Sequence, residues 1–202
     1  MQRRIDAFWL LLLMPSLAAA LGLEFKPSAH VEVQRDGNIY RAPDSPPPGA
    51  PPKVADVITT VGGGARLTLR ESLQELEVQA DADHDRYGQL STLDNTRYAI
   101  DAVARLALGS TLRSNIEASR KRQLENFAYT DNTDRGFITT DTDSADLRYA
   151  LAARISVAAK FTHTATTASL PSSRDYDLND NTAEVGADYQ RSGFSSLGFA
   201  VR

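Results

Sequence analysis

The sequence predicts an all-β protein, an antiparallel transmembrane β-barrel of meandering hairpins. Three features predict it: many segments alternate apolar and polar residues, the connections between them are alternately short and long, and an apolar leader precedes the first segment. Alternation with a period of two puts apolar side chains on one strand face and polar side chains on the other. Short turns at one end and long loops at the other are typical of outer-membrane barrels.

Composition excludes several other classes of protein. The 202 residues are 42% apolar and 24% charged, which fits neither a disordered chain nor a helical membrane protein. The chain has no cysteine, so it carries no disulfide scaffold, thiolate metal site or cysteine nucleophile. With a formal charge of -4 and no clustered Lys or Arg, it has no electrostatic basis for binding nucleic acid. We expect no cofactor and no metal.

Residues 1–20 predict a cleaved signal peptide. Arg3 and Arg4 precede an apolar run over residues 7–17, and the small residues that follow end at Ala20, the expected cleavage site. The apolar run is shorter than the roughly 20 residues that a membrane-spanning helix needs, and Pro15 interrupts it. The mature domain is therefore expected at residues 21–202, exported across the inner membrane of a bacterium.

Nine strands are expected in the mature chain. The first covers residues 23–33, where apolar side chains occupy the odd positions and polar side chains the even ones. The alternation recurs at 57–70, 75–85, 97–108, 112–124, 145–152, 155–167, 183–190 and from 194 to the end. Several of these segments reach the 9 to 11 residues or so that a transmembrane strand needs. Alternation alone also fits a soluble β-sandwich.

The predicted connections differ in length from one end of the strands to the other. Residues 71–72, 109–110, 153–154 and 191–193 are hairpin-sized, whereas 35–56, 86–95, 125–141 and 168–181 are long and polar. The loop at 35–56 is rich in proline, which favours extended backbone and predicts an exposed loop. Single-chain bacterial barrels have an even number of strands, so nine predict an incomplete barrel, truncated at its C-terminus.

Charged residues of both signs dominate the polar positions of the strands. In a barrel these positions face the lumen, although the same charges could simply pair across the sheet and stabilise the wall. The residues expected to line the pore are Glu32, Arg66, Arg70, Glu75, Glu77, Asp81, Asp83, Arg97, Asp101, Arg105, Arg113, Glu117, Arg148, Lys160, Glu184 and Asp188.

The sequence gives only weak matches to motifs for metal binding, phosphate binding and catalysis. The acidic run at 81–85 lacks the glycine and the final glutamate of a calcium loop, since Arg86 and Thr92 stand at those positions. The glycines at 62–64 lack the Lys and Ser or Thr of a phosphate loop. They predict a bend, a bulge or a close approach to a plug, and of these we favour curvature of the wall. His163, on the apolar face, is the candidate for a lipid-active enzyme, yet no serine accompanies it.

A basic segment at 120–122 lies near the outer end of the fifth predicted strand. Arg120, Lys121 and Arg122 could contact anionic lipid headgroups or the phosphates of lipopolysaccharide. They could equally form a solvated loop edge.

The order of motifs along the mature chain resembles that of the EpsL-type outer-membrane β-barrel porins encoded with exopolysaccharide biosynthesis genes. The resemblance lies in the segments 34–41, 56–60, 84–87, 120–128 and 175–179, with a proline-rich loop between the first two. It implies an outer-membrane barrel that takes part in polysaccharide secretion, with outer-membrane lipid, lipopolysaccharide, polysaccharide and periplasmic export proteins as partners. It supplies no catalytic residues, and we expect no enzyme activity.

The main hypothesis is therefore an outer-membrane pore or scaffold for exopolysaccharide export. The alternatives are a secreted, soluble β-sandwich that binds glycan, and a general porin for small polar solutes.

Overall fold

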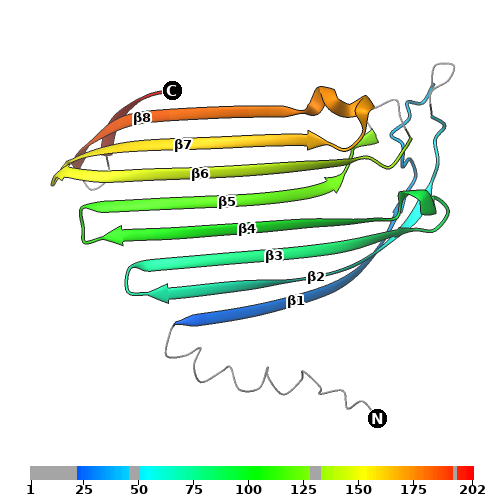
Figure 1. The fold of residues 1–202 in the computed structure, drawn as a ribbon, viewed down its shortest axis with the longest axis horizontal. Helices are drawn as coiled ribbons and strands as arrows, with labels where there is room; N and C mark the ends of the chain where they lie inside the picture. The colour runs from blue at the N-terminus through cyan, green and yellow to red at the C-terminus, as the bar shows by residue number, and fades with distance from the viewer. Residues whose placement is uncertain (1–21, 46–50, 128–132, 193–194) are drawn as a thin grey trace, which may run out of the picture.

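Nine antiparallel strands form one meandering sheet in the computed structural model, which describes residues 22–45, 51–127, 133–192 and 195–202 (Figure 1). Each strand pairs with its neighbours in the chain, and the described parts of the loops contain two short 3-10 helices. The strands are β1 (Leu23–Asp36), β2 (Asp56–Glu71), β3 (Gln74–Tyr87), β4 (Asn95–Leu108), β5 (Leu112–Leu124), β6 (Phe137–Ala152), β7 (Ile155–Ala168), β8 (Leu178–Ser192) and β9 (Ser195–Val201). The helices are η2 (Ser91–Leu93) and η4 (Pro171–Tyr176).

The predicted number of strands and their order are confirmed, and the largest differences are the starts of β6 and β8. Strand β6 begins at Phe137 rather than at residue 145, and β8 begins at Leu178 rather than at 183. After Phe137 and Ile138 in β6 and Leu178 in β8, both extensions are polar on their two faces, so they show no alternation to detect. They are strands because their backbone groups complete the ladders with β5 and β7.

Short hairpins and long loops lie at opposite ends of the sheet, as predicted (Figure 1). The hairpins at 72–73, 109–111 and 153–154 define the hairpin end, and the loops at 37–55, 88–94, 125–136 and 169–177 define the loop end. Ser72 and Gly109 adopt positive φ angles of 56° and 60°, which allow tight reversals. The turn at 193–194, the prolines at 46–48 and the signal peptide with its cleavage site at Ala20 lie outside the described residues.

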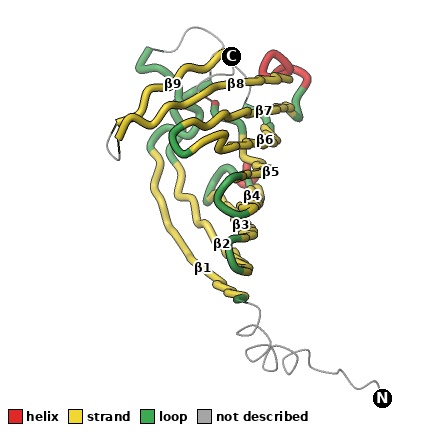
Figure 2. The backbone as a smooth tube through the Cα atoms, turned by 90° about the vertical axis from the view of Figure 1, so that its left-hand side faces the viewer, coloured by secondary structure: helices red, strands yellow, loops and turns green. Residues whose placement is uncertain are grey.

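The sheet is curved but open (Figure 2). Strands β1 and β9 are its two edges, and because successive strands alternate in direction, both run the same way. The closed wall of a complete barrel is therefore not formed by the described residues, in agreement with the odd number of strands. These residues also form one sheet, whereas a sandwich needs two. No described helix is long and apolar enough to span a membrane.

The largest cluster of buried apolar side chains lies among the loops, not on a face of the sheet. Ile39, Leu93 and Phe127 are buried together, and Tyr40 packs edge-on against Phe127 with ring centres 5.2 Å apart. These contacts join the loops 37–55, 88–94 and 125–136, which we call the loop core. The expectation of a wholly exposed loop at 35–56 is thus wrong for Ile39, which is 6% exposed.

Asp56 fixes the base of the loop core. Its carboxylate is buried and accepts hydrogen bonds from the main-chain N–H groups of Val57, Gln89 and Leu90, at 2.7, 3.0 and 2.8 Å. A carboxylate that accepts several amide hydrogen bonds compensates for its own burial. The first residue of β2 therefore orders the loop between β3 and β4.

Candidate functional site

The predicted pore-lining residues all lie on one face of the sheet. In an antiparallel pair, directly opposite residues point to the same side, so the register carries a face from strand to strand. Lys26 lies opposite Arg66, Arg66 opposite Gln79, and Gln79 opposite Asp101. The same parity continues to β8, where Lys160 on β7 lies opposite Glu184. We call this side the polar face.

The polar face is the concave side of the sheet. Side chains from strands that are not neighbours meet on it: His30 Nε2 of β1 lies 3.3 Å from Asp83 Oδ1 of β3, across β2. In the same way, Arg148 Nη2 of β6 donates to Asp188 Oδ2 of β8 at 2.9 Å, across β7. Side chains converge like this on the inside of a curved sheet, which matches the arc of strands in Figure 2.

Ion pairs connect the strands at the hairpin end of the polar face. Glu75 lies between Arg70 of β2 and Arg105 of β4 and forms ion pairs with both, at 2.6 Å with Arg70 Nε. Glu24 accepts from Lys26 Nζ at 2.8 Å and lies 3.8 Å from Arg70 Nη1. All five side chains are at least partly exposed, so the pairs act mainly to hold a hydrated charged surface in place.

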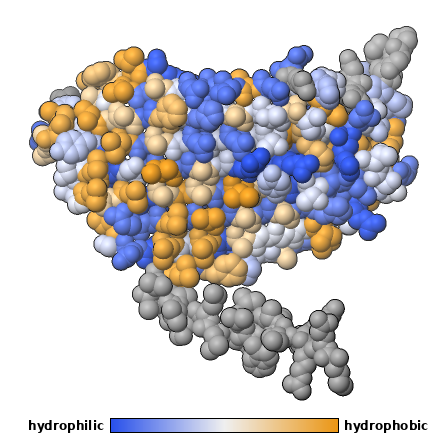
Figure 3. Space-filling model, in the orientation of Figure 1, coloured by the Kyte–Doolittle hydropathy of each residue, from blue (hydrophilic) through white to orange (hydrophobic). Residues whose placement is uncertain are grey.

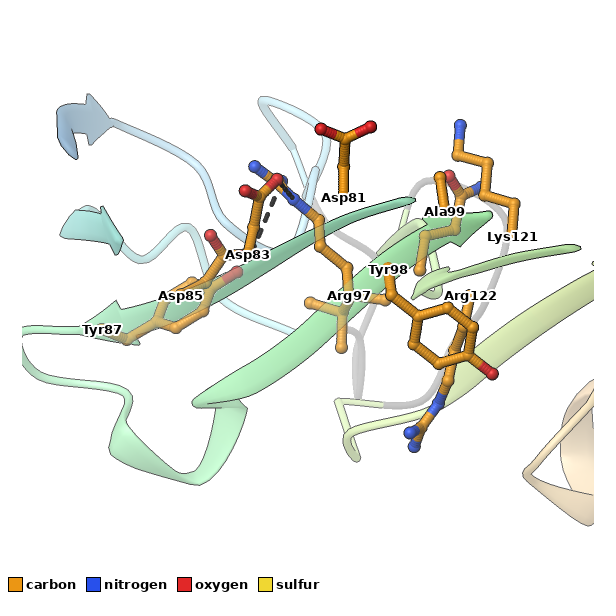
Figure 4. Close-up of a pocket in the computed structure, with 11 residues that line it drawn as sticks. Asp81, Asp83, Asp85, Tyr87, Arg97, Tyr98, Ala99, Lys121 and Arg122 are labelled. Atoms are coloured by element: carbon orange, nitrogen blue, oxygen red, sulfur yellow. Dashed lines mark hydrogen bonds and ion pairs between the residues drawn. The ribbon is translucent and has the colours of Figure 1, made fainter. Parts of the chain in front are cut away.

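Nearer the loop end, an arginine bridges two aspartates. Arg97 Nε donates to Asp83 Oδ2 at 3.0 Å, and Arg97 Nη1 lies 3.5 Å from Asp85 Oδ2. Asp85 is buried and also accepts from Thr60 Oγ1 at 2.6 Å. These groups line a groove of about 400 Å³ together with Asp81, Lys121 and neighbouring residues (Figure 4).

Glycines in β2 make the contacts of this groove possible. A Cβ atom at Gly62 would lie 1.9 Å from Asp83 Oδ1 and 2.6 Å from His30 Cε1. At Gly64 it would lie 2.1 Å from Asp81 Oδ1. The register of β2 runs without a shift through both positions, so the strand has no bulge there, and the sheet shows the curvature that was favoured over a bulge (Figure 2). The glycines also leave room for carboxylates that lean over from β3.

Substituting Gly62 should therefore disrupt the groove. We expect Gly62→Val to displace Asp83 and His30 and to cost about 1 to 3 kcal/mol, the usual cost of overpacking. Urea unfolding of the folded protein checks the cost. Gly37→Val is the control, because a Cβ atom there meets nothing within 4 Å. Equal stability of the two variants would contradict the role given to Gly62.

Hydroxyl groups replace charges in the middle of β6 and β7. Thr140, Thr142 and Ser144 of β6 lie opposite Thr166, Thr164 and Thr162 of β7 on the polar face. The Thr140 and Thr166 hydroxyl oxygens are 3.4 Å apart. The polar face thus combines a strongly charged part on β1 to β4 with a neutral, hydrogen-bonding part on β6 and β7. Neither part contains the continuous apolar lining of a typical drug-sized ligand pocket.

The opposite, convex side carries apolar residues that nothing in the described structure covers; we call it the apolar face. The exposed large apolar side chains lie on it, except for Leu73, Leu151 and Leu178. Val31 is 70% exposed and Phe199 72%. Figure 3 shows hydrophobic side chains concentrated toward the hairpin end, at the left, and hydrophilic ones toward the loop end.

The basic segment 120–122 divides between the two faces. Lys121 points to the polar face, and Figure 4 shows its side chain on the same side as Asp81 and opposite to Arg122 and Tyr98. Arg120 shares the convex side with Arg122 and pairs with Asp141 at 3.5 Å. Only the two arginines therefore share a side, and contact of the segment with lipid headgroups stays a prediction.

His163 has a hydrogen-bond partner, but no serine or threonine lies directly beside it on its face. Its Nδ1 lies 2.9 Å from Asn181 Oδ1, and the next residues on the same face of β7 are Phe161 and Ala165. Neither can act as the nucleophile of a hydrolase. Among the described residues, no group of three or more His, Asp or Glu side chains could hold a metal ion.

Comparison with known proteins found no relative. No family model matches the chain, and no curated protein or solved structure is significantly similar to it.

Proposed function

We propose that this chain forms part of the wall of an outer-membrane β-barrel pore, with the apolar face in lipid and the polar face lining a hydrated channel. The observation that carries the proposal is the apolar face itself. Monomeric soluble proteins rarely expose contiguous apolar patches larger than a few hundred Å². Here exposed apolar side chains occur on every strand from β1 to β9.

The strand lengths support the same proposal. Strands β1 to β8 contain 13 to 16 residues each, more than the 9 to 11 or so that cross a bilayer when tilted. Backbone hydrogen bonds are satisfied between strands, which is the condition for a sheet in lipid. In lipid, edges β1 and β9 need partner strands, and antiparallel closure requires an odd number of them.

We propose a polar polymer as the cargo, specifically an exopolysaccharide during export. The polar face supports this through its charged pairs and the hydroxyl groups of β6 and β7, which can exchange hydrogen bonds with a sliding polyhydroxyl chain. The resemblance to the EpsL type supplies the link to polysaccharide. The signal peptide expected at residues 1–20 supplies the route to the outer membrane.

Insertion into lipid tests the membrane part of the proposal. The protein, refolded in detergent and mixed with phosphatidylcholine vesicles, should float with the vesicles and migrate faster on a gel before heating than after. Both results follow from a folded sheet whose apolar face lies in lipid. A protein that stays soluble without detergent and shows no heat-dependent shift would rule out the membrane proposal and favour a soluble glycan-binding protein.

Conductance measurements distinguish a polymer from small solutes as the cargo of the pore. In planar bilayers, added neutral polysaccharide should interrupt the ion current through the pore reversibly if the polar face guides a polymer. Uninterrupted current, together with rapid passage of small sugars in vesicle swelling, would instead indicate a general porin for small polar solutes.

A further inference from the structure

A pair of arginines lies where the apolar face gives way to charge. On the convex side of β5, Ile116 and Ala118 are followed toward the loop end by Arg120 and Arg122. The change from apolar to basic takes place between Ala118 and Arg120, which are successive residues on this side of the strand. If the apolar face lies in lipid, these arginines stand at the level of the headgroups.

One aromatic ring brings two guanidinium groups together at this level. The Cζ atom of Arg122 lies 3.9 Å above the centre of the Phe137 ring, at the start of β6. The Cζ atom of Arg135 lies 6.0 Å from the same centre. Aromatic rings attract guanidinium groups within about 6 Å. Arg135 is held further by donating from Nη1 to the main-chain carbonyl of Asp94 at 2.5 Å.

Neither arginine forms an ion pair with an acid of the described residues. Glu125, whose carboxylate lies beside Gly136, accepts a hydrogen bond from Ser173 Oγ at 2.5 Å. Asp141, on the same side, pairs with Arg120 at 3.5 Å. Asp143 lies one step nearer the hairpin end, opposite His163. The contacts that hold Arg122 and Arg135, an aromatic ring and a carbonyl oxygen, carry no net charge. Their distances from the shared ring place the two guanidinium groups within about 10 Å of each other, and two cations at such a separation attract an anion.

We propose that Arg122 and Arg135 bind the phosphate group of a membrane lipid. A guanidinium presents paired N–H donors that match the oxygens of a phosphate. A lipid fits better than free phosphate because the apolar face begins directly beside the arginines and can receive the acyl chains. This inference rests on the proposed membrane function. It adds that the sheet binds a lipid phosphate group at its loop end.

Binding of lipid A, a phosphorylated lipid, to the full chain tests the proposal. The protein is inserted into phosphatidylcholine vesicles with and without lipid A, then extracted in mild detergent and analysed by native mass spectrometry for retained lipid. We expect retained lipid A, reduced about fivefold by Arg122→Gln or Arg135→Gln alone and about thirtyfold by both. Lys121→Gln, which removes the adjacent charge from the other side of the sheet, should retain lipid A as the unchanged protein does.

The outcomes separate this site from the membrane proposal. Insertion into both kinds of vesicle with no retained lipid A would overturn the phosphate site alone, whereas failure to insert into either would overturn the membrane function. Equal loss in the Lys121→Gln and Arg122→Gln variants would also overturn the site, because it would indicate general attraction. Tight binding of inorganic phosphate by the detergent-folded protein, lost in the double variant, would overturn the assignment to lipid. Heat-dependent gel mobility verifies that each variant is folded.

Discussion

Replacing Val78 by arginine should destabilise the inserted protein by about 2 to 4 kcal/mol, the cost of a cation near the bilayer midplane on the outside of a barrel. Val78 lies on the apolar face of β3, opposite Leu67 on β2 and Ala102 on β4. The new charge would thus have apolar neighbours on both adjacent strands. Urea unfolding in phosphatidylcholine vesicles, followed by circular dichroism or gel mobility, measures the loss.

The same substitution on the other face provides the control. Val103 lies on the polar face of β4, opposite Glu77 on β3 and Glu117 on β5. An arginine at this position has a carboxylate on either side, so we expect Val103→Arg to cost less than about 1 kcal/mol, since cross-strand charge pairs are favourable. If the two variants were equally stable, the assignment of the apolar face to lipid would be wrong.

Strand positions could be predicted from the sequence wherever the two faces differ in polarity. Strand β5 has the predicted bounds, because Leu112, Ile116 and Leu124 alternate with charged residues. The first half of β6 was missed because Thr139, Asp141 and Asp143 occupy the face that is apolar elsewhere. A strand defined by its backbone ladder alone leaves no periodic signal in the side chains.

The face of each charged residue could also be predicted, but not its partner. Alternation assigns Asp83 to the polar face, whereas its contacts with His30 and Arg97 depend on the register of three strands and on the missing side chain at Gly62. For the glycines at 62–64 a bend, a bulge and a close approach all stayed open, since sequence alone does not reveal which side chains lean over a strand. The register of β2 with β1 and β3 has no shift, so it shows that the glycines make room for side chains and do not form a bulge.

The loop core had no signal in the sequence. Ile39, Leu93 and Phe127 come from three different loops, and none belongs to a periodic segment. Loops are generally read as exposed and polar, which is why the proline-rich segment was expected to be exposed. Only the chain path at the loop end brings these residues together. Their position matters for the proposed pore, because the loops that they join lie at the loop end of the concave face.

Removing the central side chain of the loop core should therefore loosen the entrance of the proposed channel and leave the sheet intact. Leu93 is fully buried between Ile39 and Phe127, so Leu93→Ala should cost about 2 to 5 kcal/mol of local stability, the range for large-to-small changes in a core. The cost falls on the loops 37–55, 88–94 and 125–136, because the strand ladders do not depend on Leu93. Faster amide hydrogen exchange in these loops, with β3 to β5 unchanged, measures it.

Leu73→Ala is the matched control for this prediction, since Leu73 lies at the hairpin end and is 63% exposed. A substitution at such an exposed position usually changes stability by no more than about 0.5 kcal/mol. If the loops rest on the channel entrance, Leu93→Ala should also increase the conductance of single pores, and Leu73→Ala should not. Unchanged exchange in the Leu93→Ala loops would mean that the loop core does not order them. Faster exchange without a change in conductance would place the narrow part of the channel at the groove beside Asp83 and Arg97, below the loops.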